Sequence, residues 1–294
     1  MTLSGSFLAF AGSVTGRDHR RAERDGQDGY ALVETDEVVA AIVTDGCSSG
    51  RTSELGARVG AVWLAALVAR RFAGVCAVSD VCAVGDVGDV RAVSAVSDVG
   101  DVGDVGGPLV TAARDVTREL LDRLELLARS FDPAGEIHAA RVGDALLFGF
   151  LAAVVTPGGA VVFGVGDGIV AIGDRVISID PGPENAPPYL AYGLLRQERL
   201  DATAPSRIER VALAPSIHFV GPTSDLDALA VATDGAAPLV ARSATEQEIT
   251  LAALVRDPRL ARNPSLLRKR LLVLSDRGTF SDDTTIAVVR RRPA

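Results

Sequence analysis

Cysteine, lysine, tryptophan and methionine are almost missing from this sequence. The chain has three cysteines, one tryptophan and one methionine, and Lys269 is the only lysine among 30 basic residues. A small, odd number of cysteines without paired spacing excludes both a disulfide framework and a cysteine-ligated zinc site. Aromatic residues make up only 4% of the chain, whereas hydrophobic residues make up 48%. The core must therefore be built mainly from Ala, Val, Leu and Ile.

Excess positive charge and long hydrophobic runs are also absent. The formal net charge is −8 and the pI is about 5.0, which argues against nucleic acid or an anionic membrane as a partner, because both require basic patches. The longest apolar run, residues 145–155, is too short to cross a bilayer. The first residues lack the basic region and apolar core of a secretory signal. We therefore expect a cytoplasmic protein that binds neither nucleic acid nor membranes.

One segment differs from the rest of the chain in its periodicity. From residue 75 to 105, a valine recurs at every third position, separated by pairs such as Gly-Asp and Ser-Asp. This period matches neither an amphipathic helix, at about 3.6 residues, nor a strand, at about 2. Six aspartates against one arginine give the segment −5 of the chain's net charge of −8.

The Gly-Asp repeats have two interpretations. They offer oxygen ligands to Ca²⁺, as calcium-binding turn arrays do, but such arrays have longer units and denser carboxylates. We favour a repeat expansion tolerated in a surface loop, since lengthening a loop costs little closure entropy. The sequence thus predicts a single domain over residues 1–294, in which residues 75–107 are a low-complexity insertion between two helices.

Strand-rich regions flank a helical middle. Apolar runs bounded by turn residues indicate strands at residues 6–14, 30–35, 38–44, 145–155, 160–165, 169–172, 176–179, 228–233 and 284–289. Helical periodicity indicates helices at residues 53–72, 110–131, 246–255 and 266–274. The third of these helices would begin at a capping box of Thr245 and Glu248. Strands first, helices inserted and strands again indicate an α+β fold.

Acidic residues recur where the predicted core strands end. Asp-Gly follows an apolar strand at Asp45, Asp167 and Asp234, and Asp282 and Asp283 precede the last strand. A single Asp-Gly is most often a structural turn. If these strand ends converge on one rim, however, their carboxylates would repel one another unless a cation neutralised them. Ligands that are all oxygen select Mg²⁺ or Mn²⁺ over zinc.

Two such cations would suit the hydrolysis of a phosphate ester. They lower the pKa of a shared water and neutralise the phosphate oxygens, so no nucleophilic side chain is required. The sequence agrees with this, because no Cys-x5-Arg loop surrounds any of the three cysteines and no Asp-x-Asp pair follows the first strand.

The order and separation of the acidic motifs resemble those of the metal-dependent protein phosphatases of the 2C type. The motifs that carry the resemblance are Asp45-Gly46, Gly166-Asp167-Gly168, Ala232-Thr233-Asp234-Gly235 and Asp282-Asp283-Thr284-Thr285. Three further stretches resemble a bacterial subgroup of the family, namely Gly16-Arg17-Asp18-His19, Gln27-Asp28 and residues 45–58. Together these motifs cover nearly the whole chain except the repeat.

The resemblance implies a four-layer αββα sandwich, in which two central antiparallel sheets carry a binuclear metal site at one edge. It implies that Asp45 bridges both metals, that Gly46 offers its backbone carbonyl, and that Asp234 and Asp282 ligate the second metal. Asp167 would belong to a third, weaker metal site. The metals would be Mg²⁺ or Mn²⁺.

Further residues take roles from the same resemblance. Asp28 matches an acidic residue that orients water, and His19 is a candidate for positioning the phosphate or the water. Gln27 stands where many members have a Glu ligand, and Cys47 stands where the eukaryotic enzymes have a His thought to act as general acid. Both replacements are usual in the bacterial subgroup.

The function expected from these residues is a serine/threonine protein phosphatase that uses a metal-activated water. Its substrate would be a phosphorylated protein, and it would oppose a serine/threonine kinase. The alternative is a catalytically weak or inactive phosphoprotein-binding module of the same fold, in which Gln27 has degraded one metal site. Clustered carboxylates favour the enzyme, because a pure binding module has no need of them.

The remaining candidate residues are less specific. His138 and His218 have no recognisable partners and are expected to be structural. Residues 164–168 superficially resemble a nucleotide-binding glycine loop, but they lie within a strand meander. The arginine that grips phosphate is left open among four candidates, Arg17, Arg20, Arg21 and Arg24.

Overall fold

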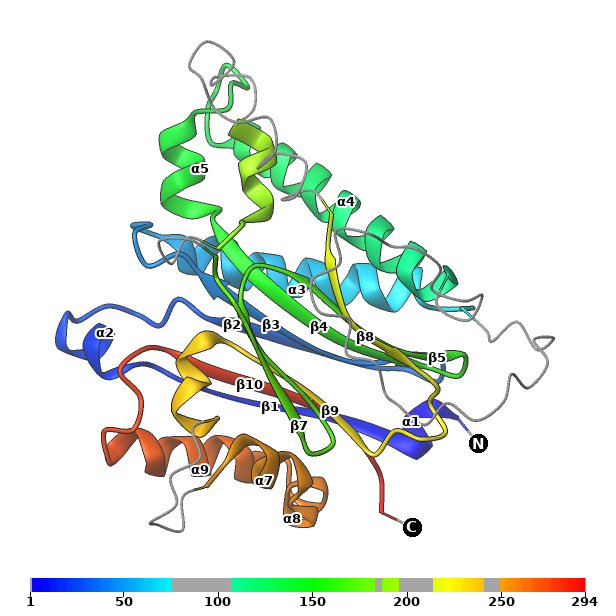
Figure 1. Cartoon of the computed structure of the whole chain (residues 1–294). Coiled ribbons are helices and arrows are strands. Elements are labelled where there is room, and N and C mark those ends of the chain that lie inside the picture. Colours follow the sequence, from blue (N-terminus) through cyan, green and yellow to red (C-terminus); the bar gives the residue numbers. More distant parts are fainter. Residues whose placement is uncertain (1, 76–106, 183–186, 196–213, 241–248, 294) are drawn as a thin grey trace.

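Two five-stranded antiparallel sheets form the centre of the protein (Figure 1). The computed structural model describes residues 2–75, 107–182, 187–195, 214–240 and 249–293. The first sheet contains, in spatial order, β1 (Phe7–Val14), β10 (Thr284–Arg291), β9 (Ala228–Ala232), β6 (Gly168–Ile172) and β7 (Arg175–Ile179). The second contains β2 (Gly29–Glu34), β3 (Val39–Gly46), β4 (Phe148–Thr156), β5 (Gly159–Val165) and β8 (Ser216–Gly221).

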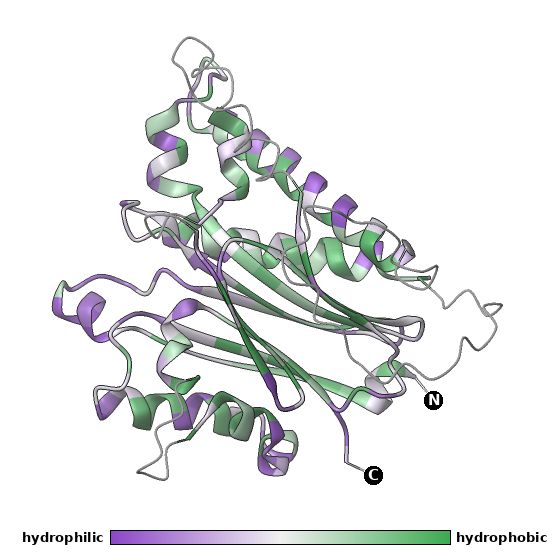
Figure 2. Ribbon diagram, in the orientation of Figure 1, coloured by the Kyte–Doolittle hydropathy of each residue, from purple (hydrophilic) through white to green (hydrophobic). Residues whose placement is uncertain are grey.

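Helices cover the outer face of each sheet (Figures 1 and 2). The second sheet is covered by α3 (Ser53–Arg71) and α4 (Gly107–Ser130), and the first by α7 (Leu251–Arg256), α8 (Pro258–Arg262) and α9 (Ser265–Asp276). Shorter elements are α1 (Leu3–Ser6), α2 (Arg17–Arg21), α5 (Ala139–Ala145), η2 (Leu190–Leu195) and η3 (Asp234–Leu239). The described residues confirm the predicted α+β sandwich with four layers, helix, sheet, sheet and helix.

The burial of both sheet faces explains why the strands are so apolar. Along β3, Ala40 and Ile42 pack toward the helices, whereas Val39, Ala41 and Val43 pack against the other sheet. Because side chains alternate along a strand, a strand covered on both faces needs a continuous apolar run. Figure 2 shows these runs in green between the layers. Small residues suffice here, which is why the core needs few aromatics.

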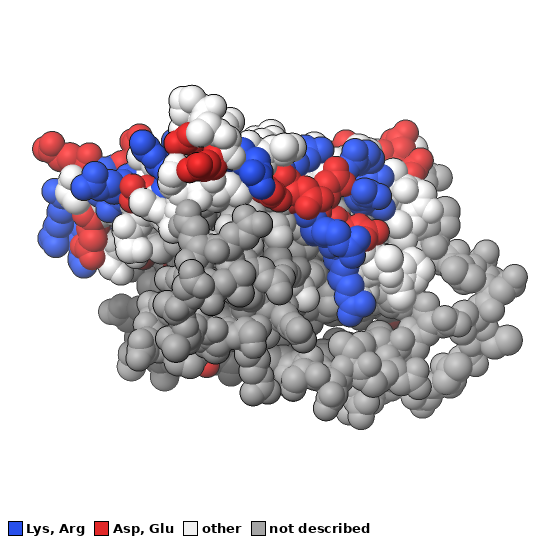
Figure 3. Space-filling view, turned by 90° about the horizontal axis from the view of Figure 1, so that it is seen from above, with Lys and Arg blue, Asp and Glu red and all other residues white. Residues whose placement is uncertain are grey.

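The two long helices of the outer layer are tied together by packing and by charge. Leu64 and Leu67 of α3 share one core with Val116 and Leu120 of α4. Glu119 of α4 also pairs with Arg70 and with Arg71, the latter at 2.9 Å. On the face viewed in Figure 3, acidic and basic side chains of the described residues lie interspersed, as expected of a surface without a patch of one sign.

Several predicted boundaries are wrong. Ala145 is the last residue of α5, so the strand predicted at 145–155 begins only at Phe148. The helix predicted at 246–255 begins at Leu251, because the Thr250 hydroxyl accepts a hydrogen bond from the Ala253 amide at 3.2 Å. The capping box of Thr245 and Glu248, and almost all of the 75–107 insertion, lie outside the described residues. Strand β8 was missed, since its sequence SIHFVG does not alternate cleanly.

Membrane-spanning character is absent from the described helices. None of them combines sufficient length with the low charge and high hydropathy needed to cross a bilayer.

Candidate metal centre

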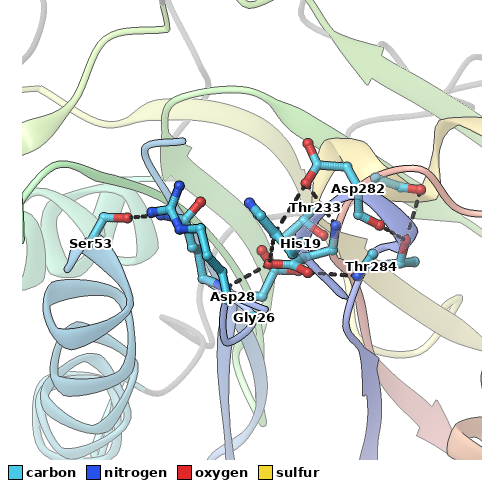
Figure 4. Close-up of polar contacts among 12 residues, drawn as sticks. His19, Gly26, Asp28, Ser53, Thr233, Asp282 and Thr284 are labelled. Atoms are coloured by element: carbon cyan, nitrogen blue, oxygen red, sulfur yellow. Dashed lines mark hydrogen bonds and ion pairs between the residues drawn. The ribbon is translucent and has the colours of Figure 1, made fainter. Parts of the chain in front are cut away.

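The acidic ends of the predicted core strands meet at one edge of the sandwich. Asp45 lies at the end of β3, Asp167 lies between β5 and β6, and Asp234 follows β9. Asp28 precedes β2, and Asp282 precedes β10. The packing of the two sheets against each other brings these ends together, although Asp28 and Asp282 are more than 200 residues apart in the sequence. The expected convergence is thus present, and Figure 4 shows part of it around Asp28 and Asp282.

These carboxylates disfavour one another's charge. Burial, together with repulsion from Asp28, Asp234 and Asp167, raises the pKa of Asp45 well above its usual range. Burial and repulsion from Asp234 raise the pKa of Asp167 to about 6. Burial also raises the pKa of Asp282, and Asp234 adds to the shift. A cluster of this kind stores repulsion that a bound cation would relieve.

Asp28 is the most buried of the predicted site aspartates. Burial, and then repulsion from Asp283, raises its pKa well above the usual range, although the hydroxyls of Thr285 and Thr233 oppose the shift. The Thr233 hydroxyl donates to Asp28 Oδ2 at 2.9 Å (Figure 4). This bond joins the start of β2 in one sheet to the end of β9 in the other. Asp28 is therefore held in a fixed position at the floor of the cluster.

Asp283 is a site residue that the sequence analysis did not select. Its carboxylate is buried and accepts three hydrogen bonds, from Gly16 N at 2.7 Å, from Gln27 N at 2.6 Å and from His19 Nδ1 at 2.8 Å. The motif containing Asp283 was recognised, but only its first aspartate was assigned a role. The signal available was the doublet Asp282-Asp283, whose two members must point in opposite directions from an extended chain.

Two glycines allow the chain to close tightly around this doublet. A Cβ atom on Gly16 would lie 2.3 Å from the carbonyl carbon of Asp282, and one on Gly235 would lie 1.9 Å from the carbonyl oxygen of Asp283. Neither distance is compatible with a side chain. Gly235 is therefore required by close backbone approach, which gives the third Asp-Gly pair a structural role beside any chemical one.

His19 lies against the same doublet, on the short helix α2. Its Nδ1 is 2.8 Å from Asp283 Oδ2 and 3.9 Å from Asp282 Oδ1, and its side chain is only 13% exposed. Backbone bonds from Arg17 N to Phe280 O and from Asp18 N to Ser281 O hold α2 in place. Because Asp283 accepts from Nδ1, Nε2 is left as the free ring nitrogen. His19, Asp282 and Asp283 together could hold a metal ion, with possible ligand atoms within 4.8 Å of one another.

Gln27 supplies an observation that bears directly on a cation. Its Nε2 donates to Ser53 Oγ at 2.6 Å, and also faces the carbonyl oxygens of Cys47 and Gly50 at 3.3 and 3.4 Å. These two carbonyl oxygens fix the orientation of the amide, because both are acceptors and must face the NH₂ group of Gln27 and not its oxygen. Its Oε1 is buried and has no hydrogen-bond partner among the described residues. An acceptor left without a donor costs free energy, unless a cation or its water occupies the position.

The residues present thus fit a divalent oxygen-ligated cation. The donor set consists of carboxylates, one orphaned amide oxygen and backbone carbonyls, without cysteine or clustered imidazoles. Cys47 instead faces Ser49, with Sγ 3.1 Å from the hydroxyl. Burial raises the pKa of the Cys47 thiol, but hydrogen bonds from Ser49, Tyr189 and nearby backbone amides outweigh burial and lower it overall.

The arginine candidates separate by their contacts. Arg24 Nη2 donates to Gly50 O at 2.9 Å, in the loop that follows Asp45. Arg20 reaches away to Ser275 on α9, and Arg17 and Arg21 pair with Asp18. Among these contacts, only that of Arg24 is made with a loop of the centre.

The two other histidines lie outside the centre. His138 Nε2 is 2.9 Å from Asp132 on the surface. His218 lies on β8, where burial lowers its pKa to about 4.

Comparisons with known proteins identify a family from the sequence and a shared fold from the structure. The model of the protein phosphatase 2C family matches residues 15–262. A bacterial serine phosphatase is similar in structure, with a TM-score of 0.51 and 13% identity, covering 97% of this chain and 98% of its own. A serine-threonine phosphatase 2C from Toxoplasma gondii has a TM-score of 0.53 and 14% identity, covering 98% and 95%. No curated protein sequence matches the chain.

Proposed function

Because the chain belongs to the protein phosphatase 2C family, we propose that it is a Mg²⁺- or Mn²⁺-dependent phosphatase that hydrolyses phosphoserine and phosphothreonine in proteins. Metal dependence and serine/threonine phosphatase activity are general to this family. The specific proposal is that this chain is a competent enzyme and that two divalent cations, with a third bound more weakly, serve it.

The single observation that carries the proposal is the mutual repulsion within the acidic cluster. Asp28, Asp45, Asp167 and Asp282 all have raised pKa values, with burial as the first cause and neighbouring carboxylates adding to it. A module that only bound phosphoproteins would need positive charge at this position, because phosphate is an anion. Clustered carboxylates at the same edge are explained by a cation that sits between them and the phosphate.

Each residue has a proposed role in holding the cations. Asp45 would contact both, with the Gly46 carbonyl beside it, and Asp234 and Asp282 would hold the second. Asp167 would belong to the third site. The orphaned Oε1 of Gln27 would face the first cation directly or through water. Bound cations would supply a water of lowered pKa and would neutralise the phosphate oxygens.

The side chains around the cluster would position the reactants. Asp28, which accepts from the Thr233 hydroxyl, would accept a hydrogen bond from the attacking water and so aim it. His19, fixed by Asp283 through Nδ1, has Nε2 free to contact water or a phosphate oxygen. Arg24, anchored at Gly50, is the candidate that grips the phosphate. The family implies a phosphoprotein substrate, and the enzyme would oppose a serine/threonine kinase.

A phosphatase assay with metal control tests this function. Purified protein is incubated with phosphothreonine and phosphoserine peptides in Mn²⁺, in Mg²⁺ and in excess chelator. We expect phosphate release in both metals and none in chelator. The proposal is contradicted if release is absent under all conditions while Mn²⁺ still raises the melting temperature, because the cluster would then bind metal without catalysis.

A further inference from the structure

A groove follows the open seam of the sandwich on one side of the candidate metal centre. β1 and β2 are the terminal strands of their respective sheets, and they face each other across the two layers. The groove occupies about 290 Å³ between these two strands and the N-terminal half of α9. It contains none of the residues assigned to the metal centre.

The walls of the groove are apolar and exposed. Tyr30 and Leu32 of β2 are 44% and 37% exposed, and Leu272 of α9 is 38% exposed. They line the same groove as the small residues Ala9 and Ala11 of β1. Side chains of this size usually lie in the core, and several of them in one concave surface are typical of a binding site.

The charged residues that line the groove are basic, in a chain whose net charge is −8, and the neighbouring carboxylate of Glu34 is engaged by Ala9 N at 2.7 Å and by Arg292 at 3.6 Å. The two charged lining residues are Arg268 and Lys269, both exposed. Neither forms an ion pair with another residue in the part of the chain that the structure describes. The first turn of α9 carries no acidic residue, so the positive end of its dipole faces the same region. The groove is therefore complementary to an acidic ligand with an apolar side chain.

The groove lies close to the centre along both strands that line it. Tyr30 lies only two residues after Asp28, and β1 ends two residues before Gly16. A strand rises about 3.3 Å per residue, so Leu32 lies roughly 13 Å along the chain from Asp28. An extended peptide of a few residues spans that distance. One substrate chain can therefore place its phosphorylated residue at the centre and its flanking segment in the groove.

We propose that this groove binds an acidic segment beside the phosphorylated residue of the protein substrate, an inference that rests on the proposed function. An apolar side chain of that segment packs against Tyr30, Leu32 and Leu272, and its carboxylates face Arg268 and Lys269. The groove selects substrates by sequence, while the centre hydrolyses the phosphate ester.

The test uses two phosphothreonine peptides and two charge-reversal variants. One peptide carries an acidic flank with one Phe, and the other carries Lys in place of each acidic residue. Arg268→Glu/Lys269→Glu alters the groove, and Arg114→Glu/Arg118→Glu makes the same charge change on the exposed side of α4. Steady-state kinetics are measured in Mn²⁺ for both peptides and for p-nitrophenyl phosphate, which is too small to reach the groove. Anisotropy of the unphosphorylated fluorescent acidic peptide is measured without metal.

We expect the groove variant to raise KM for the acidic peptide about tenfold, with kcat and p-nitrophenyl phosphate turnover unchanged, and to weaken anisotropy binding similarly. The α4 variant should leave all of these values near wild type. Equal effects of the two variants, or no preference for the acidic peptide, would overturn the groove assignment. So would a concentration-dependent dimer in sedimentation that the groove variant abolishes, since a second copy would then be the occupant. If the wild-type protein does not hydrolyse p-nitrophenyl phosphate at all, the proposed phosphatase activity is contradicted. The anisotropy measurement would still show whether the groove binds the acidic peptide.

Discussion

Asp283 accepts a hydrogen bond from His19 Nδ1 at 2.8 Å, although the two residues are 264 positions apart in the sequence. The same carboxylate also accepts hydrogen bonds from the backbone amides of Gly16 and Gln27. It thereby attaches the whole segment that carries His19, Arg24, Gln27 and Asp28 to the beginning of β10. Backbone bonds from Arg17 and Asp18 to Phe280 and Ser281 also hold this segment, but the Asp283 side chain contacts Gly16, His19 and Gln27 together.

Asp282 and Asp283 should therefore respond differently to replacement by Asn. Asp283→Asn removes an acceptor oxygen from buried donors and should lower the free energy of unfolding by about 1.5–3 kcal/mol. Asp282→Asn keeps the acceptor for the Asp283 amide and should leave metal-free stability nearly unchanged, while weakening Mn²⁺ binding. Urea unfolding in chelator, paired with Mn²⁺ titration, measures both. Equal destabilisation by the two variants would show that Asp283 has no special positioning role.

Gln27→Glu should have two effects of opposite sign. An added carboxylate near divalent cations gains attraction at short range, so the Mn²⁺ concentration for half-maximal activity should fall. Without metal, the same change replaces the Nε2 donor by an oxygen that faces the carbonyls of Cys47 and Gly50. Metal-free stability should then fall by about 1–3 kcal/mol. A Mn²⁺ midpoint that stays or rises would mean that Gln27 does not face a cation.

The stability of the metal-free protein should decrease as pH rises toward neutrality. Asp167 has a pKa of about 6 in the folded state, against an ordinary value of 3.8. A raised pKa means that the folded state binds the proton more tightly, so this contribution is complete below pH 3.8 and is lost as pH rises through 6. Asp167→Asn should flatten that dependence in chelator. Urea midpoints of both proteins between pH 4 and pH 7 give the comparison, and parallel curves would exclude Asp167 as a source.

Replacement of residues 76–106 by a short Gly-Ser linker should leave the melting temperature and the activity close to wild type. The adjoining helices are held by Leu64, Leu67, Val116 and Leu120 in one core, and by Glu119 with Arg71. A loop of different length changes closure entropy only slightly. A fall of many degrees, or a saturable Ca²⁺ site in the full chain that the deletion removes, would favour the calcium-array interpretation.

Much of the fold could be predicted because the strands are apolar on both faces. Runs such as residues 38–44 and 228–233 are recognisable without knowing their neighbours, and the Asp-Gly turns mark their ends. Helix ends that depend on a single capping residue were harder to predict from the sequence. Thr250 caps α7 without the capping-box pattern that a sequence can show, and packing of Leu251 and Leu254 into the core fixes where this helix begins.

The clustering of the carboxylates could be predicted from the sequence, but the contacts that support the cluster could not. Asp28, Asp45, Asp167, Asp234 and Asp282 are marked by strand ends and by the family resemblance. Asp283 acts through bonds to Gly16, His19 and Gln27, which are distant in sequence, so no local pattern reveals it. The groove of Tyr30 and Leu32 was also hidden, since an exposed apolar residue on an edge strand has the same sequence pattern as a buried one.

The most direct test of the metal centre is the melting temperature of Asp45→Asn, with chelator and with Mn²⁺, beside its turnover of a phosphopeptide. Because Asp45 is repelled by Asp28, Asp234 and Asp167, removing its charge should leave the metal-free melting temperature equal or higher. Wild type should gain stability from Mn²⁺, by about 2.7 kcal/mol at a hundredfold excess over Kd. The variant should lose most of that gain and nearly all turnover. Wild-type turnover together with the full Mn²⁺-induced rise in Asp45→Asn would contradict the assignment of a metal-dependent phosphatase centre.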